Sequence, residues 1–348
     1  MVRRVWVVAF VMTVSLNALS ALSCARAAEH DTPPGPKTLP EAATDLLHGL
    51  PQQPKPAPLP AVDLGPLEEL APGVQIVKGK WVVLSGKINV DQGPVDGLEV
   101  FACLKDGKNH EALVRLDTTL GQLVKAAHIA ALGLSDGQPT SEMSGIPARG
   151  TPVTLTVRWQ NADKKWVELP ASSMVRDRIV DLPYPALPFV YVGSRFETVY
   201  TNGADGKAQS REVFMLDATR SIAVNFDEPD ALLASPFPGA RFDQRFETYS
   251  AVCPPTGTPV QLVVGVATLP LTIAMAADGT LHAGAQTLDD AALAAKFATA
   301  FASAPLHAVG VTVAAATDHA HDVAARARIM AAAVAAGVWV APVFILAP

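Results

Sequence analysis

The chain is poor in the residues and motifs that usually identify an enzyme from its sequence. Its 348 residues include three cysteines, Cys24, Cys103 and Cys253, one short of a four-thiolate zinc or iron–sulfur site. There is no phosphate-binding loop, no dinucleotide-binding glycine fingerprint and no G-x-S-x-G nucleophile motif. These absences argue against nucleotide-dependent enzymes and α/β-hydrolases, and we predict no cofactor.

Charge is also scarce, at 17% of residues, and the net charge is −6. The lysines and arginines are scattered and form no basic stripe, which argues against nucleic acid as a partner. Hydrophobic residues make up 49% of the chain, enough to build the cores of about two domains.

The first 27 residues resemble a secretory signal peptide. Arg3 and Arg4 precede the uncharged run Val5–Leu22, and Ala25-Arg26-Ala27 fits a small-x-small cleavage site. We therefore expect a periplasmic or exported protein. Two alternatives stay open: lipidation at Cys24, which would make a lipoprotein, and a retained membrane anchor.

Residues 28–72 predict a proline-rich spacer, because ten of the 29 prolines lie between Pro33 and Pro66. Residues 73–266 read as a β-rich domain of short β-branched and aromatic runs. One helix interrupts them, capped by Asp117 or Thr118 and ended by Gly133, with His128 at the edge of its apolar face as a surface histidine.

From residue 267 to 348 the pattern changes to strands alternating with helices. Residues 271–276 alternate like a strand, Asp278-Gly279 predicts a hairpin turn, and Thr287 opens a capping box. A third strand, a helix that buries Val323 and stops at Gly337, and a fourth strand follow. The predicted fold class is α+β, with a small two-layer ββαβαβ domain after the β-rich one.

One pair of residues is a candidate catalytic site. If Asp106-Gly107 is a two-residue hairpin turn, Cys103 faces His110 across two antiparallel strands. A thiol beside an imidazole can act as a nucleophile. The alternative is a buried cysteine and an ordinary sheet histidine.

Two weaker candidates concern binding. Arg195, in Gly193-Ser194-Arg195 after an apolar strand, is suited to an anion. Asp318, His319 and His321 lie in a short Asp- and His-rich run. One loop rarely supplies a whole metal site, so we predict no metal there and interpret Asp318 as a helix N-cap.

Two stretches resemble known families. LEVFACLKDGKNHEALV, FVYVGSRF and DEPDALLASP, within residues 74–265, are similar to the YdjY-like domain of exported bacterial proteins. TIAMAADGTLHAGAQTLDDAALAAKF and the sequence after it, within 267–347, resemble the periplasmic domain of the ExbD/TolR family. That family implies partners in a proton-driven envelope motor, but the only apolar run here lacks the membrane aspartate.

These observations predict an exported, non-enzymatic cell-envelope binding or scaffolding protein. The expected partners are envelope proteins or peptidoglycan, with a homodimer through the C-terminal domain, and contact with a membrane only through the N-terminal segment or Cys24. The alternatives are a periplasmic thiol enzyme or redox protein using Cys103 and His110, and an anchored accessory subunit of an ExbBD/TolQR-type transport system.

Overall fold

A computed structural model describes residues 55–93, 97–139, 146–179, 181–184, 187–202, 208–226, 228–237, 245–302 and 306–347. These residues belong to one compact unit. The predicted signal peptide and most of the predicted spacer lie outside the described residues. Within the described part, no helix has the length and apolar character needed to cross a membrane.

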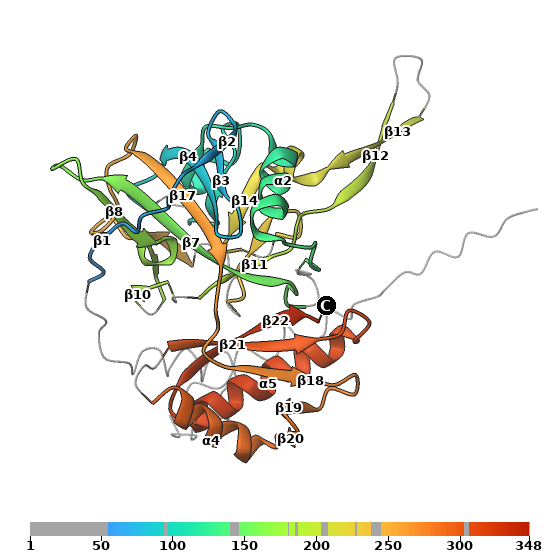
Figure 1. Cartoon of the computed structure of the whole chain (residues 1–348). Helices are drawn as coiled ribbons and strands as arrows, with labels where there is room; N and C mark the ends of the chain where they lie inside the picture. The colour runs from blue at the N-terminus through green and yellow to red at the C-terminus, as the bar shows by residue number, and fades with distance from the viewer. Residues whose placement is uncertain are drawn as a thin grey trace, which may run out of the picture. The chain divides into compact units, whose positions relative to one another are not determined.

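A closed eight-stranded barrel forms the larger, N-terminal part of the described chain (Figure 1). Its strands follow the order β7-β11-β15-β14-β5-β6-β4-β17, and β17 closes it by pairing with both β4 and β7. The strands are β4 (Trp81–Ile88), β5 (Val100–Cys103), β6 (Ala112–Leu116), β7 (Thr151–Gln160), β11 (Phe189–Tyr191), β14 (Ser221–Val224), β15 (Leu233–Ala234) and β17 (Pro259–Val266).

Shorter strands pair with two of the barrel strands, outside the closed barrel itself. The added strands are β1 (Leu59–Pro60) and β8 (Trp166–Pro170) beside β7, and β2 (Glu68–Ala71) and β3 (Val74–Val77) beside β4. A separate small sheet holds β9 (Val175–Asp177), β10 (Leu182–Pro183) and β16 (Phe246–Thr248), next to the 3-10 helix η2 (Ala171–Met174). The end of the predicted spacer is therefore part of the sheet, as β1 and β2.

The barrel interior is filled by aliphatic side chains that alternate along each strand. On β4, Val82 and Leu84 are completely buried, and Leu262 and Val264 of β17 are buried opposite them. Each such burial stabilises the fold by about 1.5–3 kcal/mol. Gly86 is required where β4 and β6 approach, because a Cβ there would lie 2.5 Å from the carbonyl oxygen of Arg115.

Helix α2 (Gly121–Leu132) packs on β3 and β4 and ends at Gly133, as predicted, with φ of 65°. The prediction that His128 is a surface histidine is wrong, because its side chain is completely buried. The buried stripe of α2 includes Val124, His128 and Ala131, so the His128 ring faces the barrel and stacks on Tyr191 at 5.9 Å between centroids.

The C-terminal part contains one five-stranded sheet, ordered β20-β19-β18-β21-β22, with two helices. The elements are β18 (Thr272–Met275), β19 (Leu281–Ala283), β20 (Gln286–Thr287), α4 (Asp290–Ala300), β21 (Leu306–Val313), α5 (His319–Ala335) and β22 (Trp339–Leu346). Strand β21 is parallel to both β18 and β22. Asp289 caps α4 and Asp318 caps α5, each accepting a backbone N–H.

The predicted fold class, α+β with a separate two-layer ββαβαβ domain, is wrong. The described chain is β-rich, and three strands rather than two precede α4. One face of the C-terminal sheet packs on α4 and α5, whereas Trp339, Ala341 and Val343 of β22 join the core of the barrel. The Trp339 ring stacks on Phe237 at 5.6 Å. Because both faces are covered, this sheet is the middle of three layers.

A two-stranded arm, β12 (Phe196–Asn202) and β13 (Ala208–Phe214), leaves the barrel between β11 and β14 (Figure 1). The two strands pair antiparallel from Phe196↔Phe214 to Asn202↔Ala208. The short helix α3 (Met215–Thr219) follows and leads directly into β14. The arm therefore rises next to the end of the barrel that carries α3.

Candidate functional site

An open cleft of about 890 Å³ lies at the base of the arm. The loop between β5 and β6, the residue before β12, the end of α3 and the loop after β14 form its walls. Its charged lining residues are Asp106, Lys108, Arg195, Arg220, Glu228 and Asp230. We call this site the charged cleft. Three cations and three carboxylates balance there, and Phe226 and Pro229 add apolar surface.

Two cations of the charged cleft are held by carboxylates. Lys108 Nζ lies 3.2 Å from Glu228 Oε2, and Arg195 Nε lies 2.7 Å from Asp230 Oδ1. Burial alone would lower the pKa of Lys108, but the Glu228 and Glu111 carboxylates outweigh burial, and the pKa is raised. Lys108 and Arg195 are thus fixed cations that hold the loop after β14 against the rest of the cleft.

The third cation, Arg220, is held differently. Its Nη1 donates to the carbonyl oxygen of Thr119 at 2.9 Å. Among the described residues, no carboxylate lies within ion-pair distance of its guanidinium. A guanidinium carries five N–H donors in a planar fork, so Arg220 retains donors for a ligand in the cleft.

Unusual backbone conformations surround the charged cleft. Arg220 and Ser194 have positive φ values of 65° and 57°, a region that residues other than glycine rarely occupy. Such a conformation costs about 1–3 kcal/mol. Ser194 Oγ donates to the Asp230 carbonyl at 2.6 Å and accepts from the Leu216 amide at 3.1 Å. Strain is therefore held at the two points where Arg195 and Arg220 enter the cleft.

The hairpin predicted for Cys103 and His110 is wrong. Strands β5 and β6 are parallel, and Cys103 pairs with Arg115. His110 lies in the 3-10 helix η1 (Asn109–Glu111), where its side chain is 79% exposed on the rim of the charged cleft. Cys103 is fully buried, and burial raises the pKa of its thiol to about 12. The structure therefore does not bring the predicted catalytic pair together.

The other predicted binding residues fall in two places. Arg195 lines the charged cleft. Asp318 caps α5, His319 Nδ1 lies 3.2 Å from Asp322 Oδ2, and His321 lies against Gly279. These three residues serve the start of α5 and its neighbouring turn.

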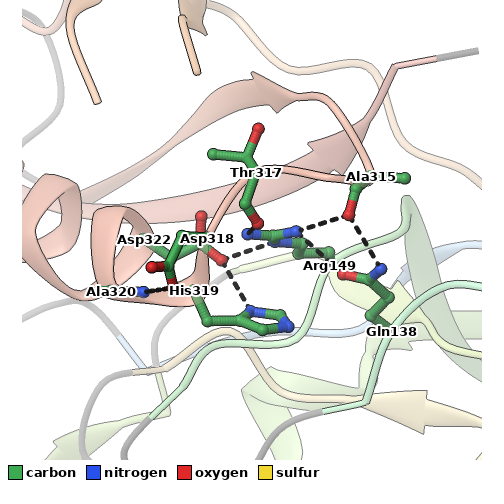
Figure 2. Close-up of polar contacts among 8 residues, drawn as sticks. All are labelled: Gln138, Arg149, Ala315, Thr317, Asp318, His319, Ala320 and Asp322. Carbon is green, nitrogen blue, oxygen red and sulfur yellow. Dashed lines mark hydrogen bonds and ion pairs between the residues drawn. The ribbon is translucent and has the colours of Figure 1, made fainter. Parts of the chain in front are cut away.

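Sequence reasoning missed the buried network next to them (Figure 2). Arg149, just before β7, places Nε 2.6 Å from Asp322 Oδ2, and both side chains are completely buried. Arg149 also donates to Gln138 Oε1 at 3.0 Å and to the Thr317 carbonyl at 2.7 Å. These contacts use most of the N–H donors of Arg149, and they join the barrel to the C-terminal sheet.

A second cavity, of about 330 Å³, lies where β17 leads into the C-terminal sheet. Its walls include Leu155, Leu187, Phe189 and Leu269, and no charged side chain lines it. Its polar lining side chains are the neutral hydroxyl groups of Thr154, Thr156, Ser172 and Thr268, which form weaker hydrogen bonds to a ligand than charged groups do. The charged cleft is therefore the better candidate site.

Comparison with family models, curated proteins and solved structures finds no match to this chain. The resemblances to YdjY-like and ExbD/TolR-like domains therefore stay predictions.

Proposed function

We propose that the protein is an exported, non-enzymatic binding protein of the cell envelope that holds a carboxylate-bearing ligand in the charged cleft. The exported location follows from the signal-like residues 1–27. The ligand class follows from the side chains that line the cleft.

The observation that carries this proposal is the position of Arg220. It occupies the left-handed position that ends α3, where glycine is the usual residue. Glycine would avoid the backbone strain, so an arginine there has a cost that its side chain must offset. Its guanidinium, with no carboxylate partner among the described residues, matches a carboxylate in shape and charge.

The balance of charge in the cleft supports a single carboxylate over a polyanion. Asp106, Glu228 and Asp230 would repel a ligand with several phosphates, and Lys108 and Arg195 are already held by two of these carboxylates. A ligand with one carboxylate and an apolar body suits Arg220 together with Phe226. The buried, protonated thiol of Cys103 gives no support to the thiol-enzyme alternative.

The test uses isothermal titration of the full chain with N-acetylphenylalanine and with its amide, which lacks the carboxylate. We expect the acid to bind at least ~10-fold more tightly, since a charge-assisted hydrogen bond contributes about 1.5–3 kcal/mol. Arg220→Gly should remove this preference, and glycine readily adopts the left-handed backbone of this position.

Lys164→Gly is the matched control, because Lys164 is an exposed cation with φ of 63° in the turn between β7 and β8. It makes the same chemical change at the same backbone geometry, outside the cleft, and should leave the preference intact. Equal binding of acid and amide, binding of neither, or equal losses in the two variants would overturn the proposal.

A further inference from the structure

The arm has two strand edges with which no other described strand pairs. Strands β12 and β13 pair only with each other among the described residues. Along the outer edge of each strand, alternate backbone N–H and C=O groups have no strand partner. An isolated two-stranded ribbon is only marginally stable in water, so a third strand would stabilise it.

The arm also begins at the charged cleft. Arg195 directly precedes β12, and Arg220 follows α3, which begins one residue after β13 ends. The Met215 amide donates to the Arg195 carbonyl at 2.9 Å, which fixes α3 against the first residue of the arm. An extended chain that lies along the arm therefore reaches the cleft at its base.

The side chains of β12 favour it over β13 as the receiving edge. Phe196 and Tyr200 are four residues apart and point to the same face, and their exposed fractions are 57% and 74%. Side chains of an added strand lie about 4.5–5.5 Å from their cross-strand neighbours, so the two rings would contact two residues of that strand that are four positions apart and share one face. Residues 209–212 of β13 are polar and exposed.

We infer that the ligand of the charged cleft is the carboxyl-terminal end of an extended peptide, which adds to the outer edge of β12 and places its terminal carboxylate on Arg220. This inference rests on the proposed function, because Arg220 supplies the anion site in both. A peptide strand rises about 3.3 Å per residue, so six residues span most of β12. Backbone hydrogen bonds supply affinity, and the two rings select apolar side chains at alternate positions.

The first test compares N-acetylphenylalanine with an N-acetylated hexapeptide of alternating valine and threonine that ends in phenylalanine with a free carboxylate. We expect the hexapeptide to bind to the full chain about 10- to 100-fold more tightly, as several added backbone hydrogen bonds predict. In an extended peptide, alternate backbone N–H groups point toward β12 and away from it. Methylating the nitrogens that point toward β12 should abolish the tighter binding of the hexapeptide, whereas methylating the others should not.

Variants locate the peptide on the arm. Tyr200→Ser should weaken hexapeptide binding about 2- to 5-fold and leave N-acetylphenylalanine binding unchanged. The control is Leu59→Ser, since Leu59 is an exposed apolar residue on β1, away from the arm. Circular dichroism at the titration temperature confirms that each variant is folded.

The two proposals fail in different ways. The strand-addition inference is wrong, and the carboxylate site stands, if N-acetylphenylalanine binds through Arg220 but the hexapeptide binds no more tightly than it does. The same conclusion follows if the two methylated series bind equally well. A stable dimer whose sedimentation is insensitive to the hexapeptide would also overturn the inference, because a second copy would then occupy the edge. If no ligand binds more tightly with a free carboxylate than as its amide, both proposals are wrong.

Discussion

Acid should destabilise this protein through His128. The ring is completely buried between α2 and the barrel, where Nδ1 lies 2.8 Å from the Val124 carbonyl oxygen and Nε2 has no hydrogen-bond partner among the described residues. Burial lowers its pKa from 6.5 to about 4. Because the unfolded chain takes up the proton first, stability is full above pH 6.5 and falls as the pH drops toward 4.

The size of this effect follows from the difference between the two pKa values. At pH 5 the unfolded histidine is protonated and the folded one is mostly neutral, so about 2 kcal/mol of unfolding free energy is lost relative to pH 8. Below pH 4 the loss approaches roughly 3 kcal/mol. Urea unfolding followed by tryptophan fluorescence between pH 8 and 5 measures it.

The matched variant is His128→Phe, which keeps a ring against Tyr191 but cannot be protonated. We expect its stability to fall by about 2 kcal/mol less than that of the original chain between pH 8 and 5. His110→Gln removes an imidazole whose side chain is 79% exposed, and it is the control for the loss of a histidine outside the core. If His128→Phe shows the same loss as the original chain, the reasoning from burial is refuted.

Three further predictions follow from buried or crowded groups. Iodoacetamide at pH 8 should label Cys103 only after unfolding, because burial raises the pKa of its thiol to about 12. Peptide mass spectrometry measures the labelling, and rapid labelling of the native chain would contradict this prediction. Asp322→Leu should lower the free energy of unfolding in urea by about 3–5 kcal/mol, because it leaves the buried Arg149 charged and without its ion-pair partner. The double variant with Arg149→Met should recover much of this loss. Gly107→Ala places a Cβ 2.8 Å from the Cβ of Arg220, so it should lower stability by about 1–3 kcal/mol and weaken titrated N-acetylphenylalanine binding.

Features of the fold that depend on neighbours in sequence were predictable. Gly133 and Gly337 end α2 and α5 with φ values of 65° and 70°, and Asp318 caps α5, as their residue types indicate. The buried face of α5 was not predicted correctly. Val323 was expected inside but is 41% exposed, because the helix turns Asp322 inward to meet an arginine of the barrel. A pattern of apolar residues cannot anticipate a buried ion pair.

The prediction of a hairpin between β5 and β6 was wrong for a related reason. Asp106-Gly107 is a strong hairpin signal, yet the chain passes through η1 and returns parallel to β5. Strand β14, more than a hundred residues later, is the antiparallel neighbour of β5, and β6 is its parallel neighbour on the other side. Closing an eight-stranded barrel decides which strands are neighbours, and that long-range requirement overrides the local turn preference.

The same distinction explains which site residues could be found. Arg149 and Asp322 are 173 residues apart, and an isolated arginine in a sequence is most simply interpreted as exposed. Arg195 was found because it follows an apolar strand, whereas Arg220 became a candidate only through its left-handed backbone. The local sequence could have indicated this position, because a short helix ends there without a glycine, just before a buried strand. The Arg220 guanidinium offsets part of this strain by donating to the Thr119 carbonyl, and it keeps further donors for the proposed anion.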